Sequence, residues 1–187
     1  MKGFERENLY FSLCGLNCGL CPMQLDGYCP GCGGGAGNQS CPIATCSLTK
    51  GKIQYCSACE EFPCERYPEI EEFDSFLPHR NRMRDLKRYE QIGVRAYQKE
   101  IEQKRDMLLY LLEHYNDGRK KSLFCVAVNL LELSDLQEII RELKEKDWAD
   151  SAVQKEKAAF AASLLHHAAV RQGIELKLRK KPREKKA

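Results

Sequence analysis

The chain has 187 residues, of which 43% are hydrophobic and 30% are charged, and its formal net charge is +3. This size and composition allow one compact domain, or a small module joined to a modest helical domain, with a packed core that is not large. No stretch approaches the roughly 20 apolar residues that span a bilayer, and the first residues contain no apolar signal segment. We therefore expect a cytoplasmic protein that does not associate with a membrane.

The positive charge is concentrated at the C-terminal end. Residues 1–65 carry four basic and six acidic side chains, a net charge of −2, whereas residues 177–187 carry seven basic side chains and one glutamate, a net charge of +6. We expect residues 177–187 to form a basic, disordered tail. Nucleic acids are bound through clustered Lys and Arg, so we expect no nucleic-acid partner apart from weak contact through this tail.

Cysteines dominate the first third of the chain. Ten of the eleven lie between residues 14 and 64, a density far above chance. In a reducing cytoplasm, clustered cysteines bind metal more often than they form disulfides. The eleventh, Cys125, lies outside the cluster, and we expect it to be a small buried core residue. The candidate metal ligands are Cys14, Cys18, Cys21, Cys29, Cys32, Cys41, Cys46, Cys56, Cys59 and Cys64.

Three Cys-x-x-Cys pairs have the spacing of metal sites, at positions 18/21, 29/32 and 56/59. Two intervening residues let both thiolates of a tight turn reach one ion. The sharpest pattern is Cys29-Pro30-Gly31-Cys32-Gly33, which is typical of the knuckles in zinc ribbons and rubredoxin-like sites. Pro30 fixes φ at the entry to the turn, and Gly33 can adopt the positive φ that follows it. The glycine-rich residues 33–38 indicate a loop that lets the chain return to a second ligand pair.

The ligand set is purely thiolate, because all four histidines come after the cysteine cluster. Tetrahedral sulfur sites hold zinc or iron–sulfur clusters, and the knuckle and the short turns favour structural zinc. Ten thiols could supply two four-cysteine sites, and hence hold two zinc ions, with two thiols left over. The spacing does not decide which cysteines share a site. Four thiolates also close the coordination shell, so no position remains for a catalytic water.

An alternative concerns the first three cysteines of the cluster. Their Cys-x-x-x-Cys-x-x-Cys spacing is the one by which radical S-adenosylmethionine enzymes hold a four-iron cluster. Those enzymes need a long run of alternating strands and helices to build their barrel, and no such run follows residue 21. The pattern therefore carries little weight without its structural context.

The cysteine pattern also resembles a known family. The matching residues are Cys14-Gly-Leu-x-Cys18-x-x-Cys21, Cys29-x-Gly-Cys32, Cys41-x-Ile-x-x-Cys46, Lys50-Gly and Cys56-x-x-Cys59-Glu60-x-Phe62-Pro63-Cys64. Over about residues 12–67 the chain is similar to an uncharacterised prokaryotic family of cysteine-rich domains of unknown function, common in anaerobic bacteria and archaea. The resemblance implies a prokaryotic, intracellular, metal-binding protein, and it implies no reaction.

From residue 68 onward the cysteines give way to Leu, Glu, Lys, Arg and Ala, and the spacing of the apolar residues indicates helices. Residues 69–76 predict a short helix that ends before a proline. Residues 86–92 predict a second helix, which Gly93 ends or caps. Residues 94–116 predict a long helix with one apolar face.

Three more helices complete the predicted domain. Residues 122–132 are nearly all apolar and predict a buried helix, with a short strand as the alternative. Ser134 and Ser151 each begin a capping-box pattern, which predicts helices that run to about residues 143 and 172. Alanines in the last helix permit close packing, so we expect a small bundle. The adjacent His166 and His167 point about 100° apart on a helix, and we expect them at or near the surface.

We therefore predict a mainly α protein with a small, irregular, cysteine-rich, metal-binding module over residues 12–67, a helical bundle over 68–176 and the basic tail. The favoured function is a structural-zinc protein that serves as an interaction or scaffold module for an unknown protein partner. The alternatives are an iron–sulfur protein in anaerobic electron transfer or maturation, and a nucleic-acid-associated, zinc-ribbon-like protein. An enzyme is least supported, because the sequence shows no nucleophile–base pair, cofactor loop or open metal site.

Overall fold

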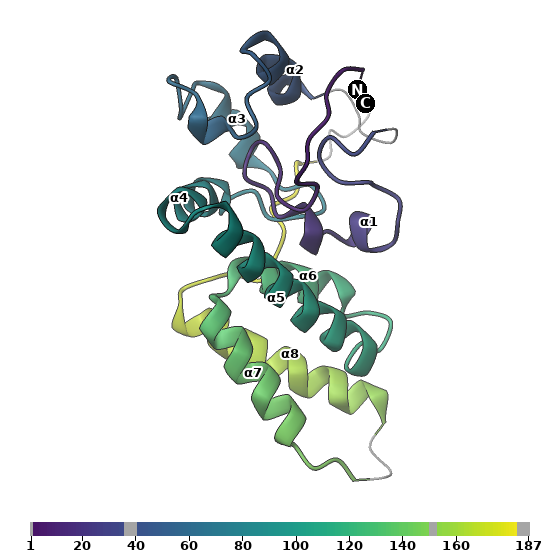
Figure 1. Ribbon diagram of the computed structural model, residues 1–187. Helices are drawn as coiled ribbons and strands as arrows, with labels where there is room; N and C mark the ends of the chain where they lie inside the picture. The colour runs from purple at the N-terminus through teal and green to yellow at the C-terminus, as the bar shows by residue number, and fades with distance from the viewer. Residues whose placement is uncertain (1, 36–40, 150–152, 183–187) are drawn as a thin grey trace, which may run out of the picture.

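The computed structural model describes residues 2–35, 41–149 and 153–182, and this part of the chain is mainly helical and contains no strand. The cysteine-rich segment lies at one end of the molecule, and the hairpin of α7 (Leu133–Glu145) and α8 (Gln154–Arg171) lies at the other (Figure 1). Helices α5 (Val94–His114) and α6 (Lys121–Leu130) lie between them. This arrangement confirms the predicted fold class. Within the same ranges, no helix is both long enough and apolar enough to cross a membrane.

The cysteine-rich segment consists of loops and short helices. Prolines occupy the first position of both α-helices in this segment, where their fixed φ suits a helix start and their missing N–H is not needed. Its elements are the 3₁₀ turn η1 (Cys18–Leu20), α1 (Pro22–Leu25), α2 (Pro42–Thr49) and the 3₁₀ turn η2 (Cys56–Ala58).

The remaining helices match the predicted order. Seven consecutive residues from Phe124 to Leu130 are buried, so the apolar segment is a helix enclosed on all sides and not a strand. Gly93, with φ of 81°, separates α4 from α5 as the sequence indicates. The helices are α3 (Arg66–Glu72), α4 (Arg82–Ile92), α5 (Val94–His114), α6 (Lys121–Leu130), α7 (Leu133–Glu145) and α8 (Gln154–Arg171).

Several predicted boundaries differ from the observed ones. Helix α3 starts before residue 69 and ends at Glu72, because Phe73 takes an extended conformation. The capping box at Ser134 is wrong: Glu132 is the N-cap of α7, and its carbonyl already accepts a hydrogen bond from the N–H of Leu136 at 3.2 Å. The N-cap of α8 is Val153, and the predicted cap Ser151 lies outside the described residues.

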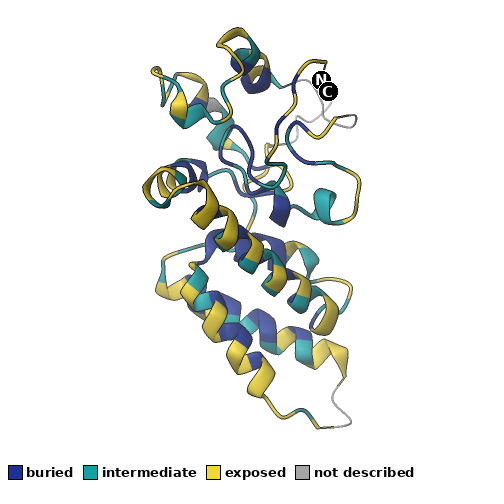
Figure 2. Ribbon diagram, viewed as in Figure 1, coloured by how far each residue is buried: buried dark blue, intermediate teal, exposed yellow. Residues whose placement is uncertain are grey.

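The cysteine-rich segment and the helices share their hydrophobic cores. Leu20 of η1 is fully buried against α5 and α6, inside the main core that α5–α8 form. Phe11 packs in a second cluster with Leu86 of α4 and Tyr97 of α5. Figure 2 shows buried residues continuing from the inner faces of the helices into the cysteine-rich segment. Each such large side chain stabilises the fold by about 1.5–3 kcal/mol, so the boundary near residue 67 does not interrupt the packing.

After α8 the chain returns to the cysteine-rich end (Figure 1). The N–H of Asp74 donates to the carbonyl of Arg179 at 2.7 Å, and the N–H of Arg179 donates to Oδ2 of Asp74 at 2.8 Å. Arg80 donates to the carbonyl of Lys177 at 3.1 Å, and Lys180 donates to the carbonyl of Ser75 at 2.8 Å. The first part of the segment for which the sequence predicts a tail is thus held by hydrogen bonds, while residues 183–187 lie outside the described residues.

Candidate metal centre

The ten predicted ligands all lie in the described part of the chain, and all are partly buried. None of them forms a disulfide, and neither does Cys125, which is buried at 1% exposure in the helical core as the sequence predicts. His166 and His167 are exposed on α8, also as expected. The fold sorts most of the ten thiols into two groups.

The first group surrounds Cys18. Its members come from η1, from the residue that caps α1, and from the predicted knuckle. Burial, followed by the negative charges of the neighbouring thiolates Cys32, Cys14, Cys21 and Cys29, raises the pKa of the Cys18 thiol well above its ordinary value. The raised pKa keeps the Cys18 thiol protonated at neutral pH, and a cation among the sulfurs would favour the thiolate instead. We call the four cysteines of the two Cys-x-x-Cys pairs the first group: Cys18, Cys21, Cys29 and Cys32.

The knuckle of the first group depends on two glycines. Gly31 has φ of 94°, and a Cβ there would clash with the carbonyl oxygen of Leu9. Gly33 has φ of 88°, the positive value that the sequence predicts, and a Cβ there would approach Arg6 to 2.9 Å. A side chain at either position would therefore displace the turn that carries Cys32.

A buried arginine stands beside the first group, and sequence reasoning missed it. Arg6 is 8% exposed, and its guanidinium donates to the carbonyls of Phe11 at 2.8 Å and Gln54 at 2.8 Å. Burial raises the pKa of Cys32, and the backbone of Leu13 and the charge of Arg6 act in the opposite direction. Arg6 therefore favours a thiolate at Cys32. Nothing in the local sequence distinguishes this arginine from a surface one.

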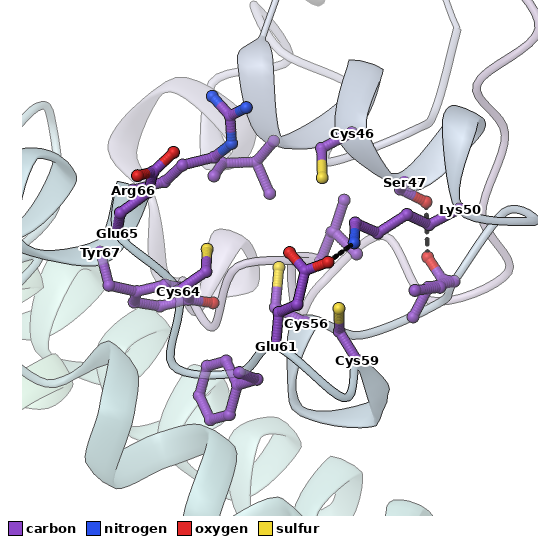
Figure 3. Close-up of a pocket in the computed structure, with 14 residues that line it drawn as sticks. Cys46, Ser47, Lys50, Cys56, Cys59, Glu61, Cys64, Glu65, Arg66 and Tyr67 are labelled. Atoms are coloured by element: carbon purple, nitrogen blue, oxygen red, sulfur yellow. Dashed lines mark hydrogen bonds and ion pairs between the residues drawn. The ribbon is translucent and has the colours of Figure 1, made fainter.

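The second group lies around a cavity of about 460 Å³. Cys46 comes from α2, while the other three come from the segment that contains η2 and the residues after it. Figure 3 shows the four sulfurs pointing into the same space between α2 and that segment. Lys50 and Glu61, which also line this cavity, form an ion pair in which the side chains are 33% and 65% exposed, respectively. We call these four the second group: Cys46, Cys56, Cys59 and Cys64.

Cys56 is the member of the second group whose environment is most unlike water. Burial raises the pKa of its thiol to about 12, and the nearby hydroxyl of Tyr67 acts in the opposite direction. The Tyr67 hydroxyl itself is buried and makes no hydrogen bond of good geometry. A thiolate at Cys56 would give this hydroxyl an acceptor.

Cys14 and Cys41 belong to neither group. Cys14 acts electrostatically on Cys18 and Cys32 of the first group and on Cys56 of the second, so it lies between the two. Its sulfur is 3.4 Å from the hydroxyl of Ser12. Cys41 packs at the edge of the small apolar cluster around Ile43. Cys14 affects Cys18 more strongly than Cys21 and Cys29 do, so it is a further candidate ligand at the first group.

The donor set of both groups suits a soft cation, since thiolates select zinc or iron–sulfur clusters. Within residues 2–35, 41–149 and 153–182, however, no three Cys, His, Asp or Glu side chains are arranged so that they could hold an ion as they stand. The four cysteines of the second group line one cavity, and those of the first group are linked by their electrostatic effect on Cys18, without the close contact of a loaded site in either group.

Comparison of the chain with protein-family models, with curated proteins and with solved structures found no match.

Proposed function

We propose that this protein binds two metal ions through cysteine thiolates, one at each group, and that zinc is the ion in both. The observation that carries the proposal is the convergence of four sulfurs from two separate segments on one cavity in the second group (Figure 3). In a reducing cytoplasm thiols do not form lasting disulfides. A metal ion is the ligand that four neighbouring thiolates can share. A reducing cytoplasm is also the compartment that this function requires.

The proposed role of the metal is structural. The apolar cluster within the cysteine-rich segment is small, with only Phe4, Leu13, Ile43 and Ala44 buried in it among the described residues. Leu20 and Phe11 anchor the segment on the helices, but its loops have only this small cluster of their own, so metal would hold them in one conformation. Four thiolates close the shell of a zinc ion and leave no open position for substrate. The loaded segment, fixed on the helices, then serves as a scaffold that presents a surface to a protein partner.

Loading requires local closure. Tetrahedral zinc with Zn–S bonds of about 2.3 Å places its sulfurs about 3.8 Å apart. The thiols of each group do not yet form such a set, so we expect the loops that carry them to tighten around the ion. Deprotonation of the thiols accompanies binding, because thiolates are the ligands.

Elemental analysis of the full-length protein, purified reduced and without oxygen, tests this function. We expect about two zinc ions per chain in the parent protein and about one in both Cys18→Ser and Cys64→Ser. The matched control is Cys125→Ser, which alters a cysteine in the helical core and should leave the zinc content unchanged. A protein that is folded and contains neither zinc nor iron would overturn the proposal.

One observation favours an iron–sulfur cluster as the second candidate for the second group. The cavity of about 460 Å³ that its four cysteines help to line is larger than a single ion needs, and a cluster of several iron and sulfide atoms spans thiolates that are farther apart. In that case the anaerobically purified protein would be brown, with absorption near roughly 400 nm. A colourless protein that carries two zinc ions would exclude this candidate.

A further inference from the structure

A second cavity lies apart from both cysteine groups, between helices α4 and α5 and the start of α7. Its volume is about 630 Å³, within the range of small-molecule sites. Its wall is strongly polar, and two of the charged residues in it, Asp85 and Lys104, are buried. The residues that matter most are Asn17, Arg84, Asp85, Lys87, Lys104 and Ser134.

Lys104 is incompletely bonded in this cavity. The residue is only 8% exposed, and its Nζ donates a hydrogen bond to the carbonyl of Leu131 at 2.7 Å. An ammonium group has three hydrogens, and no other residue in the described part of the chain accepts a hydrogen bond from this Nζ. Because a buried charge without partners is costly, two donors of Lys104 call for acceptors that the cavity contents supply.

Asp85 does not supply those acceptors. Its Oδ2 accepts hydrogen bonds from Asn17 at 2.7 Å and from Asn81 at 2.5 Å, and its Oδ1 accepts one from Arg84 at 3.1 Å. Among the described residues, Asp85 forms no ion pair with Lys104. Burial lowers the pKa of Lys104, and the charge of Asp85 acts against that effect from a distance. Asp85 already accepts three hydrogen bonds, and it therefore affects Lys104 through its charge and not through a hydrogen bond.

The two arginines of the cavity are already neutralised by carboxylates. Arg84 pairs with Asp85 at 3.1 Å and with Glu132 at 3.3 Å, and Arg88 pairs with Glu100 at 2.6 Å. The two lysines that line the cavity form no ion pair within the described ranges. The four cations of the wall therefore exceed its three carboxylates, and the excess positive charge lies on lysines.

The start of α7 adds donors to the same wall. Leu133 and Ser134, the first residues of this 13-residue helix, line the cavity. The N-cap residue Glu132 makes no side-chain hydrogen bond to the first turn. The N–H groups of that turn therefore keep their capacity to bind an anion, and the helix dipole favours negative charge there.

We propose that this cavity binds a small molecule through an anionic oxygen group, a carboxylate or a phosphate, which accepts hydrogen bonds from Lys104 and from the first turn of α7. The exposed Lys87 on α4 supplies further positive charge at the same site. The buried Asp85, Asn17 and Tyr97 line the same cavity, and the Tyr97 hydroxyl donates a hydrogen bond to Asn17 at 2.9 Å.

Isothermal titration of the full-length chain with inorganic phosphate and, separately, with succinate tests the site. We expect saturable binding of at least one of the two probes, and the probe that binds identifies phosphate or carboxylate as the preferred group. Lys104→Met should weaken that binding at least about tenfold, since charge-assisted hydrogen bonds are lost. Lys87→Met should weaken it by a smaller factor.

The matched control is Lys99→Met, which removes an exposed lysine from the same helix as Lys104 but outside the cavity. Its binding should equal that of the parent protein. If Lys104→Met does not fold, Lys87→Met and Lys99→Met decide the question between them. The proposal is overturned if neither probe binds saturably, or if Lys87→Met and every folded Lys104 variant bind as tightly as Lys99→Met does.

Discussion

Replacing Asp85 with alanine should destabilise the whole protein, because this carboxylate joins the cysteine-rich segment to the helices. Asp85 is 5% exposed on α4 and accepts hydrogen bonds from Asn17 of the cysteine-rich segment and from Asn81 and Arg84. The substitution leaves two buried amides without their acceptor and removes one bond of the Arg84 guanidinium, which still pairs with Glu132. We expect loss of about 3–5 kcal/mol, the range found when one partner of a buried charged network is removed.

The size of this loss follows from how many hydrogen-bond donors lose their acceptor and how deeply they are buried. Each unsatisfied buried donor costs about 1–3 kcal/mol, and Asn17 and Asn81 are 2% and 5% exposed. The costs of the three lost hydrogen bonds do not add in full, because removing the carboxylate also removes the penalty for burying it. Burial raises the pKa of Asp85, which reflects that penalty. Asp85→Asn keeps one acceptor oxygen and should therefore lose less than Asp85→Ala.

Urea unfolding, followed by far-ultraviolet circular dichroism, measures the effect as a shift of midpoint at constant slope. The matched control is Asp106→Ala, an exposed carboxylate on α5, which should change the free energy of unfolding by no more than about 0.5 kcal/mol. A loss below about 1 kcal/mol for Asp85→Ala would refute this reasoning, because it would mean that the three donors find other acceptors.

Three further changes test other parts of the account. Burial lowers the pKa of His79 from its ordinary 6.5 to about 4, so the unfolded chain takes up the proton first and stability falls as pH drops from about 6.5 to about 4. We expect the free energy of unfolding to fall by about 1–2 kcal/mol over this range, a value reduced because the ring is partly exposed. His79→Gln should show a flatter pH profile of urea unfolding. Leu20→Ala should lower the unfolding free energy by about 2–5 kcal/mol, since this fully buried side chain joins the cysteine-rich segment to the main core. The loss of circular dichroism and the release of metal should both move to lower urea concentration, and by the same amount. A shift in only one of the two would show that the two parts fold independently. Gly31→Ala should reduce zinc content by about one ion per chain through its clash with Leu9, whereas Gly27→Ala, also at positive φ but with nothing within 4 Å of its Cβ, should keep both ions; equal zinc content in the two variants would contradict this.

The helical part of the fold follows closely from local sequence. The apolar spacing within 94–116 yields α5, and a run of apolar residues long enough to be buried on all sides yields α6. The capping box at Ser134 misled, because the same residues satisfy the pattern inside a helix that has already started at Leu133. A cap is set by backbone hydrogen bonds that sequence spacing alone does not fix.

The candidate sites depend on contacts that local sequence does not encode. Spacing identifies all ten candidate thiols, but only the fold places Cys46 opposite Cys56 and leaves Cys14 between the groups. The bond between Asn17 and Asp85 joins residues that are 68 positions apart. Such long-range pairs arise from packing of the whole chain, so neither the buried carboxylate nor the cavity beside it could be predicted from the sequence.

We propose that sulfur atoms of this chain hold the metal. X-ray absorption at the zinc edge of the reduced, full-length protein measures the ligands directly. We expect a first shell of about four sulfur atoms at about 2.3 Å, with no nitrogen or oxygen at about 2.0–2.2 Å. A shell that contains nitrogen or oxygen ligands, or the absence of any bound metal in folded protein, would contradict the account.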